Sequence, residues 1–331
     1  MANWISNETQ VLSNKTQEKS LSCQYELGIL NGIYLREIIS GLGFFLNLIC
    51  MFIFFKILRS AKNSIDLYKY LLVASFFNSY ICLRNTLKNS LDCKSCFVEK
   101  YYAIKLLQIL FIYYVDYSFE LISIMISVAA CFNRYRSIGN TLKVFDKIPF
   151  VIVLILICVF CTGFCSYKIV DLSVQNQLNN NSTDLVIYVI KSNTLEELGL
   201  ALDIVFTLIR DAIPIFSILS LNTLTLIKIK IRLNKKKKLM SNKKVQNNIK
   251  TVNKIANNEL RLNLMVFVTT SFVLLNHLTN FLYWLKAFGK NECLNIVRNV
   301  LYWSSYGWNF FIYLSFDLNF MKIFSNNFKR N

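Results

Sequence analysis

Apolar residues gather in seven long stretches along the chain, separated by shorter segments rich in lysine, asparagine and serine. Each stretch approaches or exceeds the roughly 20 residues that an α-helix needs to cross about 30 Å of hydrocarbon. Because lipid offers no hydrogen-bond partners to the backbone, helices are the expected form. The pattern predicts an all-α membrane protein built as a seven-transmembrane helix bundle. The predicted spans cover approximately residues 33–58, 65–83, 102–133, 148–167, 198–227, 262–285 and 294–316.

The segments outside the spans define the domain organisation. Residues 1–27 are mostly polar, so we expect no cleaved signal peptide, an extracellular N-terminal segment over 1–32 and a first span that acts as its own targeting signal. Residues 33–316 form the predicted membrane domain, and 317–331 a short cytoplasmic tail. Apolar residues recur in this tail at helical spacing, which predicts a short amphipathic C-terminal helix on the membrane surface. These residues are Phe320, Ile323, Phe324 and Phe328.

Two connecting segments carry further expectations. The external segment 168–197 contains a polar, asparagine-rich patch from Gln175 to Thr183, which we expect to be flexible. The segment 228–261 should continue the flanking helices at both ends, with a mobile centre near Ser241 and Asn242.

Composition and charge support this class and orient the chain. Apolar residues make up 54% of the sequence and charged residues only 17%, which is unlike a soluble protein of this length. Segments 56–69 and 134–147 each hold four basic residues and one acid, 228–261 holds twelve and one, and 315–331 three and one. The positive-inside rule places these segments in the cytoplasm. We interpret the run 235–238 as contacting anionic lipid rather than nucleic acid, because it lies in a membrane-tethered loop.

The N-glycosylation sequons provide a separate mark of orientation. They lie at Asn7, Asn14, Asn180 and Asn181, all on the side opposite the basic segments. The two marks agree on an external N-terminus, a cytoplasmic C-terminus and an odd number of crossings. We therefore expect a glycosylated, multi-pass protein of the plasma membrane.

The ten cysteines divide by their location. Those in external segments are candidates for disulfide bonds, whose pairing the sequence leaves open. They are Cys23, Cys93, Cys96 and Cys293. The cysteines within spans are expected to be small core residues. They are Cys50, Cys82, Cys131, Cys158 and Cys161, with Cys165 near an outer helix end.

Charged residues inside the third and fifth spans are the main candidates for chemistry. Asp116 and Glu120 lie one helical turn apart, and Asp116 precedes Arg134 by 18 residues, which is about 27 Å along one helix face. Ionisable residues at this depth are costly and usually face a cavity or a partner. Arg210 in the fifth span is the candidate partner. It allows two interpretations: a buried Glu120–Arg210 ion pair that fixes helix packing, or a polar floor beneath an outer cavity.

The sixth span carries the only histidine of the chain. Glu259 precedes His277 by 18 residues, so Glu259 is expected at the cytoplasmic end and His277 in mid-membrane. His277 is either a satisfied core donor or a titrating group. Arg134 closes the third span and is either a membrane anchor or a functional switch whose partner is Glu259.

Taken together, these residues resemble the rhodopsin-like family of G-protein-coupled receptors. The arginine that ends helix three of that family is matched by Arg134 in Asn133-Arg134-Tyr135, the helix-one asparagine by Asn47, and the helix-five proline by Pro214. The helix-seven motif Asn-Pro-x-x-Tyr appears as Asn309-Phe310-Phe311-Ile312-Tyr313.

Within that family, the chain looks most similar to invertebrate FMRFamide-type neuropeptide receptors. Those tend to carry an asparagine eight residues after the helix-five proline, which is matched by Asn222. They also tend to open helix six with Glu-x-Arg-Leu-Thr-x-Met, which resembles Glu259-Leu260-Arg261-Leu262-Asn263-Leu264-Met265. Their Cys-His-x-Pro resembles Asn276-His277-Leu278-Thr279.

Several positions depart from the family pattern. The helix-two aspartate of its sodium site falls on Ser75, which puts sodium modulation in doubt, and the cysteine at the head of helix three falls on Ile109, so the usual bridge is absent or rerouted. The helix-six and helix-seven prolines fall on Thr279 and Phe310, and we expect the corresponding kinks to be softened. Asn222 stands where the family has the helix-five tyrosine.

The resemblance implies a receptor that binds an external ligand, most closely a short neuropeptide, and signals through heterotrimeric G proteins without a cofactor. Asp116 would attract a cationic ligand group, and release of Arg134 from Glu259 would free it for the G protein. The expected ligand site consists of Asp116, Glu120, Arg210, His277 and Trp303. The expected activation switch consists of Arg134, Tyr135, Glu259, Asn309 and Tyr313, with Asn47 and Pro214 in structural roles.

Two alternatives stay open at this point. A receptor for a biogenic amine or another small molecule is favoured by Asp116, although the fifth span offers Phe206 and Arg210 rather than hydroxyl groups. A transporter or channel would use Asp116, Glu120 and Arg210 as a relay, but it should show internal repeats or helices broken by glycine and proline. We do not expect an enzyme, because no nucleophile or metal constellation accompanies the single histidine.

Overall fold

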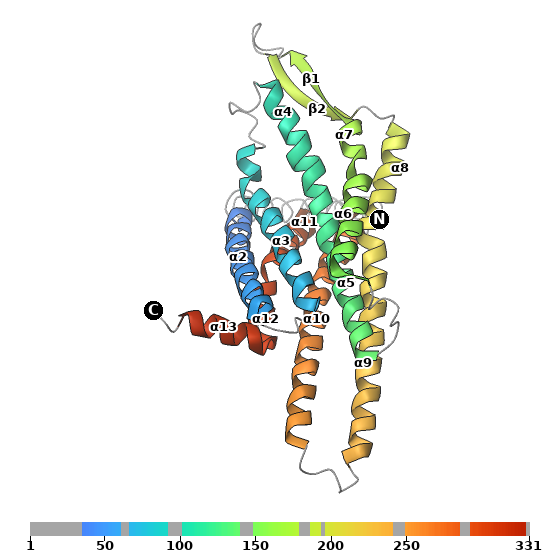
Figure 1. The fold of residues 1–331 in the computed structure, drawn as a ribbon. Helices are drawn as coiled ribbons and strands as arrows, with labels where there is room; N and C mark the ends of the chain where they lie inside the picture. The colour runs from blue at the N-terminus through green and yellow to red at the C-terminus, as the bar shows by residue number, and fades with distance from the viewer. Residues whose placement is uncertain are drawn as a thin grey trace, which may run out of the picture.

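The computed structural model describes residues 35–60, 66–91, 101–139, 148–178, 186–192, 196–240, 249–284 and 292–328 (Figure 1). Outside these ranges lie the segment 1–32 and several positions that the sequence singled out. They are Asn7, Asn14, Asn180, Asn181, Cys23, Cys93, Cys96, Ser241 and Asn242. Glu259 and Cys293 belong to described helices, but their side chains are outside the description.

Long helices run side by side and form an elongated bundle (Figure 1). The first half of the chain supplies α2 (Arg36–Ser60), α3 (Asp66–Leu91), α4 (Tyr102–Gln108), the π-helix η3 (Ile109–Val115), α5 (Asp116–Gly139), α6 (Phe150–Cys165) and α7 (Tyr167–Asp171). The second half supplies α8 (Glu196–Thr207), the π-helix η5 (Leu208–Ala212), α9 (Ile213–Met240), α10 (Ile249–Trp284), α11 (Glu292–Gly307), α12 (Asn309–Phe316) and α13 (Leu318–Phe328).

Five helical segments within the described ranges are long and apolar enough to cross a membrane. They are Arg36–Ser60, Tyr102–Ile138, Phe150–Asp171, Ala201–Arg232 and Leu260–Tyr283. These helices support an all-α membrane protein. The segment Phe150–Asp171 is the clearest example of a lipid-facing helix, because only 11% of its most apolar window is buried inside the protein. Its exposed apolar side chains would be costly in water and suit lipid.

The count of seven spans stays a prediction. The expected second span forms the long helix α3, but its asparagines, serines and charged residues keep it below the apolarity of the other five. The expected seventh span is divided into α11 and α12 at Trp308, and each part is shorter than a full crossing. In α10, by contrast, the helix continues unbroken past Thr279, in agreement with the absence of a proline there.

A β-hairpin covers one end of the bundle, where we predicted a flexible loop (Figure 1). Strand β1 (Leu172–Leu178) pairs antiparallel with β2 (Val186–Ser192), from Leu172 opposite Ser192 to Leu178 opposite Val186. The prediction of a flexible patch is thus wrong for its first residues, Gln175 to Leu178, which belong to β1. The run Val-Ile-Tyr-Val-Ile at the start of β2 explains the pairing, because β-branched and aromatic residues favour strands.

At the opposite end, α9 extends to Met240 and α10 begins at Ile249. This confirms that the segment 228–261 continues the flanking helices. The predicted C-terminal helix is also present as α13, which starts beside α12 and runs transverse to the long helices, outward from the bundle (Figure 1). We refer to the two halves of the bundle as the hairpin half and the α13 half.

The core of the α13 half is an aromatic cluster. Phe54 of α2 lies 5.0 Å from Tyr313 of α12 and 5.4 Å from Phe320 of α13, measured between ring centroids. All three rings are fully buried. Offset and edge-on ring pairs of this kind stabilise packing beyond simple burial. The amphipathic face of α13 is therefore held against α2 and α12 and does not rest on the membrane alone.

Two glycines let α2 and α11 approach closely. A Cβ atom at Gly43 would lie 2.9 Å from the sulfur of Cys82 and 3.4 Å from the Cα of Gly307. Close backbone contact through small residues is a common way to join helices in membranes. Asn47 lies four residues after Gly43 on α2 and bonds the two helices together. Its amide donates to the carbonyl oxygen of Gly43 at 2.8 Å and to that of Tyr306 in α11 at 2.9 Å.

Candidate functional site

A cavity of about 550 Å³ opens in the hairpin half of the bundle. We call it the charged cavity, because four arginines and two acids contribute to its wall. Its position follows from the chain path: α4 packs against the hairpin and continues through η3 into α5, where Asp116 is the first residue. The lining residues are Arg36, Arg84, Asn85, Ile112, Tyr113, Asp116, Tyr117, Glu120, Arg210, Asn280, Arg298, Asn299, Tyr302 and Trp303.

Asp116 forms an ion pair with Arg84 of α3. The Nε of Arg84 donates to Oδ1 of Asp116 at 2.7 Å, and its Nη2 pairs with Oδ2. The side chains are only 12% and 3% exposed, so the pair is well shielded from water. We did not single out Arg84 from the sequence, since it lies just past the predicted end of the second span. The pair means that the charge of Asp116 is already compensated within the protein.

Arg210 forms its ion pair with its neighbour in sequence rather than with Glu120. Its Nη2 lies 2.8 Å from Oδ2 of Asp211, and Oδ1 of Asp211 lies 2.6 Å from Nδ1 of His277. Glu120 does not reach Arg210 at ion-pair distance, although its charge acts on Arg210, so the first of the two interpretations is met only without direct contact. Asp211 is completely buried, and His277 nearly so. The three residues form a continuous group that joins η5 to α10, which we call the Arg210–Asp211–His277 triad.

The π-helical turn explains how the triad forms. Adjacent residues of an α-helix do not face each other. The wider turn over Leu208–Ala212 changes the direction of the side chains, and such turns are frequent at functional sites. Pro214 lies two residues after the end of this turn and has no N–H to donate to it, which gives a local cause for the irregularity. This residue, predicted to be structural, lies buried at the start of α9.

The remaining charged groups of the cavity are Glu120 and two further arginines. Glu120 is 5% exposed, and within the described part of the chain it makes no hydrogen bond and no ion pair. The guanidinium of Arg298 lies 3.9 Å from the ring centroid of Tyr283, and its Nη2 donates to Asn299 at 2.9 Å. The guanidinium of Arg36 lies 5.8 Å from the ring of Trp303, which is itself buried.

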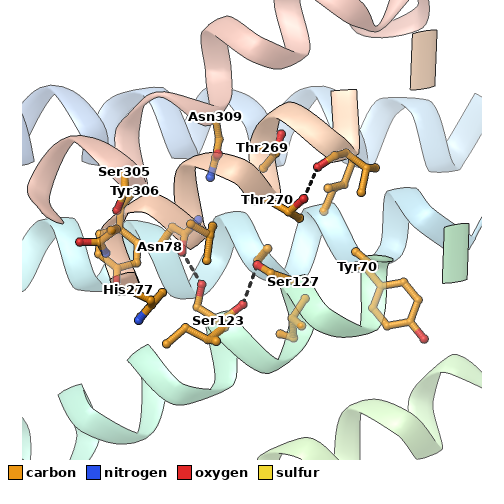
Figure 2. A pocket seen from close by; sticks show the side chains of 18 of the residues that line it. Tyr70, Asn78, Ser123, Ser127, Thr269, Thr270, His277, Ser305, Tyr306 and Asn309 are labelled. Atoms are coloured by element: carbon orange, nitrogen blue, oxygen red, sulfur yellow. Dashed lines mark hydrogen bonds between the residues drawn. The ribbon is translucent and has the colours of Figure 1, made fainter. Parts of the chain in front are cut away.

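A second, smaller cavity of about 30 Å³ occupies the middle of the bundle. Figure 2 shows its polar wall, which includes His277 of the triad. The hydroxyl of Ser123 donates to Oδ1 of Asn78 at 2.6 Å, and the hydroxyl of Ser127 donates to the carbonyl oxygen of Ser123 at 3.0 Å (Figure 2). We call this region the polar core. Its volume suits about one water molecule.

The polar core contains no carboxylate among its lining residues. Ser75, which stands where the resembled family has an aspartate, is buried nearby and donates to the carbonyl oxygen of Leu71 at 2.9 Å. Asn309, a predicted switch residue, lines the cavity, and its Oδ1 has no partner in the described part of the chain. Buried polar groups without protein partners are commonly satisfied by internal water.

Arg134 lies on the side of the polar core away from the charged cavity, in the α13 half. It is 5% exposed and lines a cavity of about 50 Å³ between α5, α9 and α10. Asn222 lines this cavity and Thr270 lines the polar core, and the amide of Asn222 donates to the hydroxyl of Thr270 at 2.9 Å between the two. Tyr135 packs against Lys228, whose Nζ lies 3.5 Å from the ring centroid. The predicted Arg134–Glu259 contact stays a prediction, because the side chain of Glu259 is not described.

The six described cysteines within and next to spans are free thiols. Cys50, Cys82, Cys131, Cys161 and Cys165 are buried, as expected for small core residues. Cys158 is partly exposed on the outer face of α6.

The structure thus brings four of the five predicted ligand-site residues to one cavity and links the fifth, His277, to it through Asp211. Sequence reasoning missed Arg84, Asp211 and Arg298 as contributors. The chain was also compared with known proteins: no family model matches it, and no curated protein matches its sequence.

Proposed function

We propose that this chain is a plasma-membrane receptor of the rhodopsin-like kind, activated by an extracellular ligand and signalling through heterotrimeric G proteins. The observation that carries the proposal is the continuous polar path from the charged cavity through the Arg210–Asp211–His277 triad to the polar core. Buried charge of this kind is costly in a membrane protein and usually serves a function.

The geometry supports a path for the signal. A ligand in the charged cavity would contact Arg210, whose partner Asp211 holds His277 of α10. A change at the triad would shift α10 relative to α9, and both helices line the cavity around Arg134. Ligand binding would thus favour a pre-existing state in which the α13 half is open to a G protein.

A short peptide remains the preferred ligand class. The cavity is large enough for a drug-sized molecule or for one end of a peptide, and most of its groups are polar. The alternative of a simple amine loses support, because Arg84 already occupies the carboxylate of Asp116 that would hold the ammonium group. An amine would have to displace a two-point ion pair with a single charge.

A functional screen tests the proposal. The full chain would be expressed at the cell surface and exposed to a short-peptide library, with calcium and cyclic-AMP readouts. We expect a peptide response that Arg134→Gln abolishes while ligand binding and surface expression persist. Arg59→Gln, at the exposed end of α2, serves as the control and should respond normally.

Two outcomes would refute the proposal. One is a response to amines but to no peptide, which would support the small-molecule alternative. The other is a ligand-evoked current or uptake in cells without G-protein coupling, which would support a transporter or channel.

A further inference from the structure

Asp317 lies between α12 and α13 and is a buried acid of the α13 half. The residue is 2% exposed. Its Oδ1 accepts hydrogen bonds from the backbone N–H groups of Asn319 at 2.9 Å and Phe320 at 3.3 Å, so Asp317 caps the first turn of α13. Its Oδ2 is buried as well and makes no regular hydrogen bond within the described ranges.

The capping role does not require the negative charge of Asp317. Asparagine and serine cap a helix about as well as aspartate, because a side-chain oxygen is sufficient. Burial outweighs the favourable contacts of the carboxylate and raises the pKa of Asp317, so the ionised form is costly at this position. An acid in place of a neutral cap therefore indicates that its charge interacts with another group.

The charge of Arg134 reaches this acid. Arg134 is 5% exposed, and its charge acts on both Asp317 and Tyr68 of α3. The hydroxyl of Tyr68 interacts with the carboxyl group of Asp317 and accepts a hydrogen bond from the amide of Asn319 at 3.3 Å. The ring of Tyr68 packs against Phe54 of α2, with 6.0 Å between the ring centroids. The end of α5, the start of α3 and the start of α13 therefore share one buried electrostatic cluster.

Arg134 is enclosed in this arrangement of the helices. The cavity that it lines between α5, α9 and α10 has a volume of only about 50 Å³, which is too small for a segment of another protein. A partner protein can therefore reach the guanidinium only after Arg134 changes its position. A movement that takes the guanidinium away from Asp317 loses part of their attraction, which water screens poorly at buried sites.

We infer that Asp317 is the counter-charge that retains Arg134 in its enclosed position while the receptor is silent. Asp317 is thus a positioning residue that acts through Arg134. The inference rests on the proposed function, in which Arg134 is the group released to the G protein. It adds a second acid, at the start of α13, to the expected partner Glu259 of α10.

The first experiment removes the charge of Asp317 and keeps the cap. Asp317→Asn is expressed at the cell surface, and ligand-free signalling per surface receptor is measured with calcium and cyclic-AMP readouts. We expect it to rise by about fivefold or more, the lower end of typical coupling between two sites. Asp317→Ser is a second neutral cap and should have the same effect if Asp317→Asn folds poorly. Asp66→Asn, which neutralises an exposed acid at the start of α3, is the matched control and should leave signalling unchanged.

The second experiment measures the interaction of the two groups without any signalling. The infrared absorption of the Asp317 carboxyl group is isolated as the difference between the purified protein and Asp317→Asn, and it is followed over pH. In Arg134→Gln the pKa of Asp317 should shift upward, because loss of a nearby positive charge disfavours the ionised form. A residue that only caps α13 would show no such shift. Arg59→Gln, at the exposed end of α2, should leave the pKa of Asp317 where it is.

The outcomes separate this inference from the proposed function. An unchanged pKa of Asp317 in Arg134→Gln overturns the inference, and a ligand response of the parent protein then leaves the receptor function intact. Parental ligand-free signalling of well-expressed Asp317→Asn and Asp317→Ser also overturns it, because the charge then retains nothing. A shifted pKa in a protein that signals through no G protein under any ligand supports the pairing and counts against the receptor function.

Discussion

Removing Arg84 provides the most direct test of the charged cavity. In Arg84→Gln, the carboxylate of Asp116 would remain buried without its counter-charge. Two unit charges about 4 Å apart attract by roughly 4 kcal/mol at an effective dielectric constant of about 20. Loss of one partner of a buried pair typically destabilises a protein by about 3–5 kcal/mol. We therefore expect Arg84→Gln to lower the unfolding temperature by on the order of 10 °C.

The double variant Arg84→Gln/Asp116→Asn should recover most of this loss, because it leaves no buried charge. Thermal unfolding of the purified protein in detergent measures all four members of the cycle. The same cycle on Lys69 and Asp66, a pair on α3 that is 37% and 45% exposed, serves as the control. For that pair we expect a coupling below about 1 kcal/mol, since solvent screens exposed charges.

The reasoning about Arg84 would be refuted by either of two results. The first is an Arg84→Gln variant as stable as the parent protein. The second is a double variant that is no more stable than Arg84→Gln alone. Both would show that Asp116 is stabilised by groups other than Arg84.

Three further predictions concern packing, the triad and pH. Gly43→Val should reduce folded protein at the cell surface, because its Cβ would lie too close to Cys82, whereas Gly163→Ala meets no atom within 4 Å and should be neutral. His277→Phe removes a partner of the buried Asp211 and should cost about 1–3 kcal/mol in thermal unfolding, with full stability contradicting the triad. Burial raises the pKa of the Asp317 carboxyl group, so ionisation of this group destabilises the folded protein. The free energy of unfolding, compared with that of Asp317→Asn, should therefore increase as the pH falls from 7 through the raised pKa toward 4.

The hydrophobic pattern was sufficient to locate the helices. Their apolar stretches are long, and the physical requirement that produces them, burial of the backbone in lipid, acts within each helix. The extension of α9 and α10 beyond the apolar stretch and the short helix α13 followed from the same local reasoning. The hairpin was not predicted, because the polar residues before β2 are typical of a flexible loop, although the first five residues of β2 favour a strand.

The partners of the charged residues could not be predicted in the same way. Arg84 meets Asp116 across two helices, and nothing in the local sequence of either helix indicates the other. Asp211 was not predicted as a site residue; in a regular α-helix it would not face Arg210, and the π-helical turn at η5 removes that constraint. Candidate residues were thus identifiable from their type and depth, whereas their pairing depends on the arrangement of the helices.

The contact between Gly43 and Gly307 has a mechanical consequence. Because α2 and α11 touch backbone to backbone and Asn47 ties them together, α11 cannot slide against α2 without losing that bond. The helix is interrupted at Trp308, one residue beyond the contact. Any rotation of α12 relative to α2 and α11 would have its pivot at Trp308 and would also have to move Tyr313 against Phe54 of α2. The chain thus has an interruption of its helix two residues before Phe310, without a proline at that position.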